Sequence, residues 1–382
     1  MRARKQQRQR GASLPDGVDF APIHRANAPE GDESYCRLCA GYGCPTRAKG
    51  SSQVALIDRA EATGRCRIVP EAHVFEILMG LDGRAQGARY IDRDGVEHEI
   101  CARVVCVCCS AVESARLLLL STSPLFPDGL GNGSGLVGRH LQFHAVTGGR
   151  GVFRREALEP EVFASEHPFL NRSIADFLLL PEGVSDLPKG GMLRFSLPQL
   201  QPVAEAQTAA HGPRGGLLWG QELAQALRRR FLETFEVNFE VFGEFIPKAG
   251  TSMRLSDEVV DRFGLPVADL SIASDPHHQK AGAWIQQRAF EILDGMGAEE
   301  TVSEAVGAPA SFLVHGTCRA GADPATSVLD EFCRSHEVPN LFVVDGSFMP
   351  TSGGAAPTLT ILANSFRTAD HILEQSRRGE FS

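Results

Sequence analysis

His315 is the residue of this sequence best suited to move a proton near neutral pH. It lies in VHGTCRAG, residues 314–321. An imidazole has its ordinary pKa close to neutrality, so it can take the proton of a hydroxyl group while the attached carbon gives up a hydride. Taken by itself, the stretch is equally consistent with a histidine that only packs in a loop, so its surroundings must decide.

Three cysteines form a second pattern with possible chemistry. Cys36 and Cys39 are spaced C-x-x-C and are followed by Cys44, and such thiolates can converge on zinc or on an iron–sulfur cluster. A fourth ligand is not evident nearby, and the second C-x-x-C of a zinc ribbon is missing. The sequence therefore predicts structural thiols and no metal site, with a three-iron cluster that relays electrons as the open alternative.

Other motifs exclude common classes. No G-x-S-x-G, Walker loop or H-E-x-x-H occurs, which argues against common hydrolases and NTPases. Residues 133–138 match G-x-G-x-x-G, but a loop rich in proline and glycine precedes them where a dinucleotide site needs a strand. His277 and His278 follow Asp275, a predicted helix N-cap, and are expected in an exposed first turn.

The composition is that of an ordinary soluble protein. The 382 residues include 38 Lys and Arg against 47 Asp and Glu, and this net charge of −9 argues against a nucleic-acid partner. The length favours two domains. The longest apolar runs, such as residues 117–120, are too short to span a bilayer, and the basic start lacks the apolar region of a signal peptide. The predicted location is cytoplasmic, without a membrane segment.

Hydrophobic spacing predicts the elements of the first half. Residues 1–34 have no periodicity and are expected to form a flexible basic arm. A helix is predicted at about 53–64, followed by a three-stranded meander at 74–79, 85–92 and 97–107, because Asp-Gly pairs separate the apolar runs.

The meander ends in VVCVCC, a continuous apolar run that is typical of a strand buried on both faces. A helix is expected directly after it, with Ala111, Ala115, Leu118 and Leu119 facing a sheet. Several thiols have apolar neighbours and are expected to be buried in a reducing compartment: Cys101, Cys106, Cys108, Cys109 and Cys333.

The second half mixes strands and helices. Strands are predicted at 192–197 and 235–247, and a helix at 279–297. The end returns to an α/β order, with a buried strand at 340–347, a turn-rich loop and a helix at 358–375. The apolar residues of that last helix share one face, which is expected to pack: Leu359, Leu362, Phe366, Ala369 and Leu373.

The C-terminal segment closely resembles the C-terminal signature of the glucose–methanol–choline (GMC) family of flavin oxidoreductases. The resemblance rests on HGTCRAGADPATSVLD, NLFVVDGSFMP and PTLTILANSFRTADHIL. Upstream, CAGYGCPTRAKGSS, VVCVCCSAVESARLLLLS and GLGNGSGLVGRHLQFH resemble successive family segments in the family's order. The resemblance covers roughly residues 36–375.

This resemblance implies an α/β fold, in which a discontinuous, Rossmann-like FAD-binding domain carries an inserted α+β substrate domain with an antiparallel sheet. The implied boundaries follow the arm at 1–34: a first FAD-binding segment at 35–145, the substrate domain at 146–305 and the C-terminal FAD-binding segment at 306–382. Members carry a G-x-G-x-x-G βαβ unit near the N-terminus, so the pyrophosphate cradle is expected to be missing from this chain.

The resemblance also assigns residues to the cofactor FAD. It places Val74 beside the adenine, and Ser110 and Glu113 near the cofactor, with Ser110 at a tight turn. It places Asp345 and Gly346 along the ribityl and phosphate groups, and Pro357 and Thr358 near the isoalloxazine. The start of the last helix would favour the anionic reduced flavin through its dipole.

The implied reaction is oxidation of the CH–OH group of an alcohol, sugar, polyol or sterol, with FAD as hydride acceptor and His315 as base. The electron acceptor is either oxygen or another molecule. The family spaces its histidine as H-x-x-G-T, a position held here by Leu313, and its partner position is Ala356. His144 and Arg319 are lesser candidates near the site. The rival prediction is a catalytically inactive remnant, or a binding protein, with the same fold.

Overall fold

The computed structural model describes residues 51–157, 172–196, 202–212, 215–273, 275–310 and 313–381. The chain divides into two compact units. One consists of Met1–Ile68, Glu156–Leu170 and Leu197–Glu233, and the other of Val69–Arg155, Asn171–Ser196 and Thr234–Ser382. The arm at 1–34 and the three cysteines at 36, 39 and 44 lie outside the described residues. The domain boundaries given above stay a prediction.

The first unit contributes short helices. They are η1 Gln53–Ile57, α2 Asp58–Ala62, α5 Pro202–Ala209, α6 Gly220–Arg228 and η3 Arg229–Glu233. The first two match the helix predicted at 53–64, and Gly64 follows them with a φ of 70°. None of the candidate site residues described below belongs to this unit.

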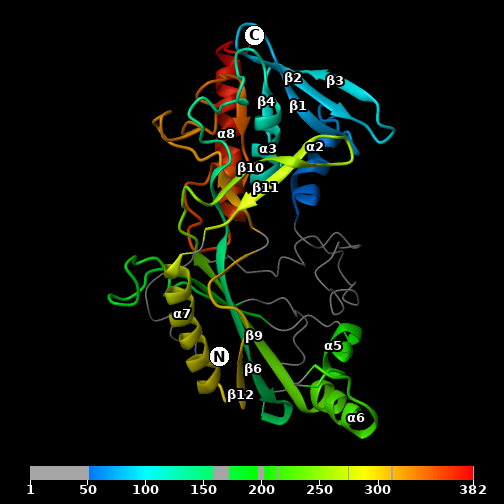
Figure 1. Cartoon of the computed structure of the whole chain (residues 1–382), viewed down its shortest axis with the longest axis vertical. Coiled ribbons are helices and arrows are strands. Elements are labelled where there is room, and N and C mark those ends of the chain that lie inside the picture. Colours follow the sequence, from blue (N-terminus) through cyan, green and yellow to red (C-terminus); the bar gives the residue numbers. More distant parts are fainter. Residues whose placement is uncertain are drawn as a thin grey trace. The chain divides into compact units, whose positions relative to one another are not determined.

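The second unit contains the predicted meander. β1 His73–Met79, β2 Ala85–Ile91 and β3 Glu97–Cys101 form an antiparallel sheet. The third predicted strand ends early, because its last part forms the separate strand β4 Val105–Val107 (Figure 1). β4 pairs in parallel with β15 Leu341–Val343. Asn340 contacts this break, since its side chain donates to the carbonyl oxygen of Arg103 at 2.8 Å. The same side chain also exchanges two hydrogen bonds with the backbone of Ala85, at 2.7 and 2.9 Å.

α3 Ala111–Leu120 follows β4 directly, as predicted. Ala111, Ala115 and Leu118 are buried on it. Ala115 and Leu118 join Val107 and other apolar side chains in the core cluster of this region. The helix therefore covers the sheet with its apolar face, and its first turn is fixed at the end of β4.

A four-stranded sheet carries the candidate base. Its order is β11 Pro266–Ser271, β10 Ser252–Val260, β5 Arg139–Gln142 and β14 His315–Thr317. The G-x-G-x-x-G match at 133–138 leads into β5 and not into a helix, so it lacks the geometry of a dinucleotide loop. Gly138 is required there, because a Cβ on it would lie 2.2 Å from the carbonyl oxygen of Met253.

The inserted antiparallel sheet is also present. β12 Glu300–Ser303, β6 His144–Arg154, β9 Thr234–Glu244, β8 Gly191–Ser196 and β7 Arg172–Ile174 follow one another in it, and β13 Ala308–Pro309 pairs with β6. The helical turn η2 Arg155–Ala157 follows β6. α7 Pro276–Gly295 packs on the sheet with Ile285, Ala289 and Leu293 buried.

Asp275 caps α7, and its side chain accepts a hydrogen bond from the backbone N–H of His277 at 2.8 Å. The predicted N-cap is confirmed, whereas the predicted exposure of the two histidines is wrong. His277 and His278 are both buried, because Ser185 and the backbone of Ile246 cover the start of the helix and bond their rings.

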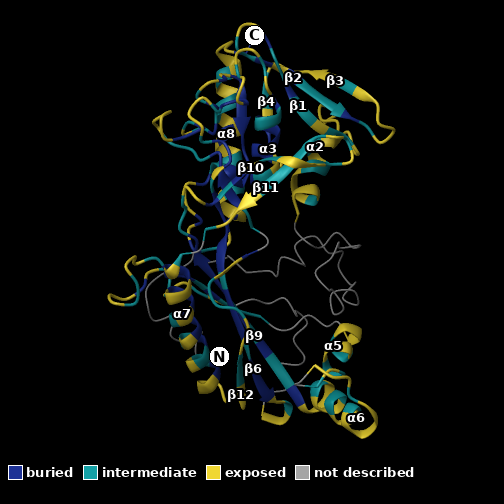
Figure 2. Cartoon of the chain, in the orientation of Figure 1, coloured by how far each residue is buried: buried dark blue, intermediate teal, exposed yellow. Residues whose placement is uncertain are grey.

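Two packing predictions near β4 are also wrong. Cys101, Cys106, Cys108 and Cys109 are exposed, whereas Cys333 is buried as predicted. α8 Thr358–Arg377 packs through a face other than the predicted one, and Figure 2 shows exposed positions along this helix. Leu359, Phe366 and Leu373 of the predicted face are exposed. No helix in the described part of the chain has the length and apolar character needed to cross a bilayer.

Candidate active site

His315 begins β14 and is fully buried. Its pairing with β5 places it opposite Gln142 in the ladder. The next residue, Gly316, has a φ of 77°, and a Cβ on it would lie 2.1 Å from the carbonyl oxygen of His140. Only glycine fits there, so the strand pairing that orients His315 depends on this sequence position.

Several buried polar atoms around His315 have no hydrogen-bond partner among the described residues. They are both ring nitrogens of His315, Nε2 of His144 and Oε1 of Gln142. The two imidazole rings lie 4.9 Å apart, centroid to centroid, at 62°. A buried polar atom without a partner costs about 1–3 kcal/mol, so a group of them marks a place where a ligand supplies the partners.

Burial, together with a smaller effect of the neighbouring His144, lowers the pKa of His315 to about 4, against an opposing effect of the backbone of Val314 and Leu313. Burial also lowers the pKa of His144. Both rings are therefore neutral at neutral pH, and a neutral imidazole nitrogen can accept a proton.

Asp345 follows β15, and its side-chain oxygens have hydrogen-bond partners, in contrast to the ring nitrogens of His315. Its carboxylate accepts hydrogen bonds from the hydroxyl groups of Ser114 and Ser347, and from the backbone N–H of Ser347 at 2.8 Å. Ser114 in turn accepts from the backbone N–H of Cys109 at 3.0 Å. This network joins the first turn of α3 to η4 Gly346–Phe348.

Gly346 lies between the Asp345 network and His315. A Cβ on it would lie 3.1 Å from the carbonyl oxygen of Val314, 3.4 Å from Cδ1 of Ile361 and 3.7 Å from Cβ of His315. The backbone after Asp345 thus approaches both the candidate base and the first turn of α8. Pro357 is the buried N-cap of that helix, and Thr358 is its exposed first residue.

A pocket of about 280 Å³ opens beside α3. Val74 and Glu113 lie in its wall, together with Cys109 and apolar side chains. Arg116, also in the wall, is fixed by ion pairs to Glu113 at 3.1 Å and to Asp261 at 2.7 Å.

Ser110 precedes α3 with φ 74° and ψ 157°, a conformation that is nearly confined to glycine. The resemblance expects glycine at this turn, and the backbone keeps the glycine geometry although the residue is serine. The turn brings the end of β4 and the start of α3 together above Asp345.

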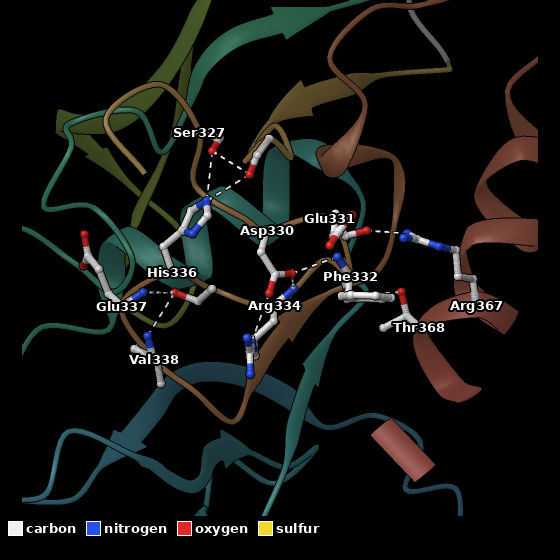
Figure 3. Close-up of polar contacts among 12 residues, drawn as sticks. Ser327, Asp330, Glu331, Phe332, Arg334, His336, Glu337, Val338, Arg367 and Thr368 are labelled. Atoms are coloured by element: carbon white, nitrogen blue, oxygen red, sulfur yellow. Dashed lines mark hydrogen bonds and ion pairs between the residues drawn. The ribbon is translucent and has the colours of Figure 1, made fainter. Parts of the chain in front are cut away.

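The loop between β14 and β15 is held by its own polar contacts (Figure 3). Asp330 accepts the backbone N–H groups of Phe332 at 2.8 Å and of Arg334 at 3.0 Å. His336 bonds the hydroxyl of Ser327 at 2.9 Å, so this histidine has the partner that His315 lacks. Arg319 donates to the carbonyl oxygen of Thr326 at 2.8 Å and thus stabilises the same loop.

The structure brings only some of the predicted residues together. Asp345 and Gly346 lie near His315, and Ser110 precedes the helix whose Ser114 bonds Asp345. Val74 and Glu113 line a separate pocket. Thr358 and Ala356 are exposed, and Ala356 offers no polar side-chain atom.

Sequence reasoning missed Ser114, Ser347 and Gln142. For Ser114 a signal existed, because it is a hydroxyl on the apolar face of a helix. No group of three or more metal-binding side chains occurs among the described residues.

Comparison with known proteins shows which family this chain resembles. The GMC oxidoreductase sequence profiles match residues 5–146 and 247–365. The chain is 31% identical to 6'''-hydroxyparomomycin C oxidase of Streptomyces lividus over 92% of its length and 60% of the relative's. It is 33% identical to 2-methyl-1,2-propanediol dehydrogenase of Mycolicibacterium austroafricanum over 76% of its own length and 51% of that protein.

A solved structure of formate oxidase from Aspergillus oryzae RIB40 superposes with a TM-score of 0.57 at 15% identity, over 87% of this chain and 64% of the other. Pyridoxine 4-oxidase from Mesorbium loti gives a TM-score of 0.54 at 18% identity, over 85% and 61%. The chain thus spans about three fifths of the length of these proteins.

The chain shares the fold of these two structures, a mixed α/β framework with antiparallel sheets. The chain belongs to the GMC oxidoreductase family, whose cofactor is FAD. Observations in the second unit fit that cofactor: the close approach at Gly346, the pocket beside Val74 and Glu113, and the unpartnered nitrogens of His315.

Proposed function

We propose that this chain takes part in the FAD-dependent oxidation of a CH–OH group in a small polyol or sugar-like molecule, with His315 as the base. One observation carries the proposal. His315 is fully buried beside Gly346, and neither of its ring nitrogens has a hydrogen-bond partner in the described part of the chain. A substrate hydroxyl would provide that partner.

His315 takes the hydroxyl proton in this proposal. Its ring is neutral because its pKa is lowered to about 4 by burial, so a nitrogen lone pair is free at neutral pH. The antiparallel pairing with Gln142 fixes the direction of the side chain. Bound FAD supplies the hydride acceptor.

His144 serves as the second polar group in place of Ala356. Its Nδ1 lies 3.4 Å from the carbonyl oxygen of Gly243, while Nε2 has no partner within the described residues. With Nδ1 donating to that carbonyl, the neutral ring presents Nε2 as an acceptor, so it can accept a hydrogen bond from a substrate hydroxyl on the sheet side of the site. Ala356 cannot do so, because its side chain has no donor or acceptor.

The cofactor would be held by two separate groups of residues. Asp345 and Gly346, at the carboxyl end of the parallel strand β15, would hold the ribityl and phosphate part, where ligands bind to α/β sheets. Val74 and Glu113 would line the place of the adenine. Pro357 and Thr358, at the start of α8, would lie near the isoalloxazine and place the positive end of the helix dipole there.

The substrate class follows from the relatives. Their names give an aminoglycoside and a diol as substrates; the aminoglycoside carries several CH–OH groups and the diol carries one, at its CH2–OH carbon. We extend this class to the present chain as a proposal. The electron acceptor, oxygen or another molecule, is left to the experiment.

The test uses the whole chain, loaded with FAD and mixed without oxygen with 2-methyl-1,2-propanediol or paromamine-type aminoglycosides. The expected result is bleaching of the flavin absorbance by at least one of them. His315→Asn should slow bleaching by a factor of about 10² or more, because a positioned base contributes that much, while flavin binding stays the same.

His336→Asn is the matched control, since His336 is already bonded to Ser327 and lies in the neighbouring loop. It should leave the bleaching rate unchanged. An unaltered rate in His315→Asn would remove His315 from the reaction. A chain that binds no FAD would contradict the whole proposal.

The exposed Ala356 favours a second candidate function, a catalytically inactive protein that keeps the fold for binding. It predicts FAD or ligand binding without flavin reduction by any CH–OH compound. If the flavin-loaded chain does not bleach, Ala356→Asn separates the two candidates: a gain of bleaching would support a weakened enzyme, and a continued absence of bleaching would support the binding protein.

A further inference from the structure

The chain from β5 into β6 turns its side chains alternately to two faces of the sheet. Leu141 and Phe143 belong to one apolar cluster. Gln142 and His144 therefore point to the other face, because side chains alternate along an extended chain. On that face the rings of His144 and His315 lie 4.9 Å apart, centroid to centroid. Gln142, His144 and His315 thus share one side of the sheet.

Gln142 is anchored through its amide nitrogen. Nε2 donates to the carbonyl oxygens of Met349 at 3.3 Å and Pro350 at 3.0 Å. These bonds fix the direction of Oε1, which has no hydrogen-bond partner in the described part of the chain. Gln142 is fully buried and stands opposite His315 in the ladder, where facing Cβ atoms are about 4.5–5.5 Å apart. Gln142 thus holds a fixed acceptor on the face that carries the candidate base.

The unpartnered atoms on this face are mostly acceptors. A backbone carbonyl only accepts, so Nδ1 of His144 carries the proton in its bond to Gly243, and Nε2 offers a lone pair. Oε1 of Gln142 also only accepts. The neutral ring of His315 adds one acceptor nitrogen and one N–H donor, because burial lowers its pKa. Within the described residues, three acceptors and one donor on this face therefore have no partner.

A single hydroxyl group does not satisfy these atoms. It carries one proton, so it donates to one of the three acceptors, and in the proposed reaction that acceptor is the nitrogen of His315. A monohydric alcohol would leave the acceptors of Gln142 and His144 buried without a donor, and such a loss weakens binding strongly. A ligand with at least two neighbouring hydroxyl groups leaves fewer of these atoms unpaired.

We propose that Gln142 determines the substrate class, because its Oε1 accepts a hydrogen bond from a hydroxyl group on the carbon next to the reacting one. The substrate is then a vicinal diol or a polyol, and a further hydroxyl group of a polyol reaches Nε2 of His144. The neighbouring carbon follows from the direct pairing of Gln142 with His315. The inference rests on the proposed function, in which the reacting hydroxyl donates to His315.

The experiment compares 2-methyl-1,2-propanediol with 2-methyl-1-propanol, which has the same carbon skeleton and the same reacting CH2–OH group but lacks the second hydroxyl. Bleaching of the flavin is followed without oxygen in the whole chain loaded with FAD. The second-order rate constant of bleaching should be about 100-fold larger for the diol. Gln142→Met keeps the length of the side chain and removes Oε1, so it should lower this ratio about tenfold by slowing the diol alone.

Gln286→Met is the matched control. Gln286 is buried on α7, where its Nε2 donates to the carbonyl oxygen of Gly148 at 2.9 Å. The variant removes the same amide from a buried position outside the face of His315, so it should leave the ratio of the two alcohols unchanged. The melting temperature shows that each variant is folded. If Gln142→Met does not fold, the ratio in the unmodified chain decides.

Binding is measured separately by calorimetry on the chain whose flavin has been reduced beforehand. A reduced flavin accepts no hydride, so the diol is bound and not consumed. The diol should bind about tenfold more tightly than the monohydric alcohol, because its second hydroxyl partners a buried acceptor. Gln142→Met should remove most of this difference.

Three outcomes would overturn the proposal: equal rate constants for the two alcohols, a diol preference that Gln142→Met leaves unchanged, or a variant that slows both alcohols equally. Failure of the proposed function looks different, since neither alcohol then bleaches the flavin, while calorimetry still shows whether the diol binds through Gln142. In a chain that takes up no FAD, the same titration of the flavin-free chain decides.

Discussion

Two buried polar regions of the second unit differ in how their atoms are satisfied. Around Asp345, both carboxylate oxygens accept hydrogen bonds, and two serines and a backbone N–H supply them. Around His315, four side-chain nitrogen and oxygen atoms on three residues have no partner among the described residues. Both regions are almost inaccessible to solvent.

The difference separates a structural role from a binding role. A satisfied network stabilises the connection between α3, β15 and η4, and gains little from further partners. Unsatisfied buried atoms reduce stability and are retained where a ligand completes them. We therefore propose that the Asp345 network keeps the backbone around Gly346 in place, and that the His315 region binds the reacting ligand and carries the proton chemistry. Four measurements test this assignment.

Asp345→Ala should have the largest effect on stability. It leaves the hydroxyl groups of Ser114 and Ser347 and one backbone N–H without their acceptor, so we expect a loss of about 3 kcal/mol or more in the free energy of unfolding. Chemical denaturation measures it. Asp330→Ala, which removes a more accessible acceptor, is the control and should cost less. A loss below that of the control would show that the network is not structural.

The pH dependence of stability should reveal His315. Its pKa is about 4 in the folded chain, against about 6.5 when unfolded, so between these values the unfolded state binds the proton and the folded state does not. Stability should therefore fall as the pH falls from 6.5 to 4, by about 1.4 kcal/mol per pH unit for each such group.

His278 has a similarly lowered pKa of about 4, caused mainly by burial, and contributes to the same window. His315→Gln should remove the contribution of one proton to the slope of the free energy of unfolding against pH, and His278→Gln should remove the contribution of the second proton. Unfolding by urea at several pH values gives the slope. If His315→Gln leaves the slope unchanged, the ring is protonated or solvated in the folded chain.

His315→Phe should stabilise the chain by about 1 kcal/mol at neutral pH, because it replaces two unpartnered nitrogens with apolar atoms of similar shape. His336→Phe, the control, should destabilise it, since it breaks the bond to Ser327. The melting temperature distinguishes the two. A destabilised His315→Phe would mean that His315 already has its partners, and the two regions would then be alike.

Ser110→Gly should give the smallest change, a gain of about 1 kcal/mol, because glycine adopts φ 74° and ψ 157° without strain. Ser110→Ala keeps the strain and should bring no gain. The same melting experiment applies. Equal stability of the two variants would show that the backbone conformation of Ser110 does not lower the stability of the chain.

Much of the fold was predictable because local patterns decided it. Asp-Gly pairs marked the meander, and the apolar spacing in 111–119 marked α3 and its packed face. The face of α8 was not predictable. Its apolar stripe follows the usual pattern, but Thr368, Ser365 and Ile372 make the contacts, because the loop at 331–334 and β15 select the side that faces them.

The site was predictable only where the chain itself brings residues together. Asp345 and Gly346 are adjacent in the sequence, and a buried strand precedes them. Ser114 and Gln142 reach the site from elements about 200 residues away, through sheet pairing and helix packing that no short pattern encodes.

The amino-acid sequence was sufficient to define the family, most of the elements and the glycines that permit their close approach, because these depend on local backbone preferences and on a dense C-terminal signature. The folded chain was needed to show that His315 is buried, neutral and without a partner beside His144, and that Asp345 is fully bonded. Burial and hydrogen bonding are properties of the surroundings, and the surroundings of both residues come from distant parts of the chain.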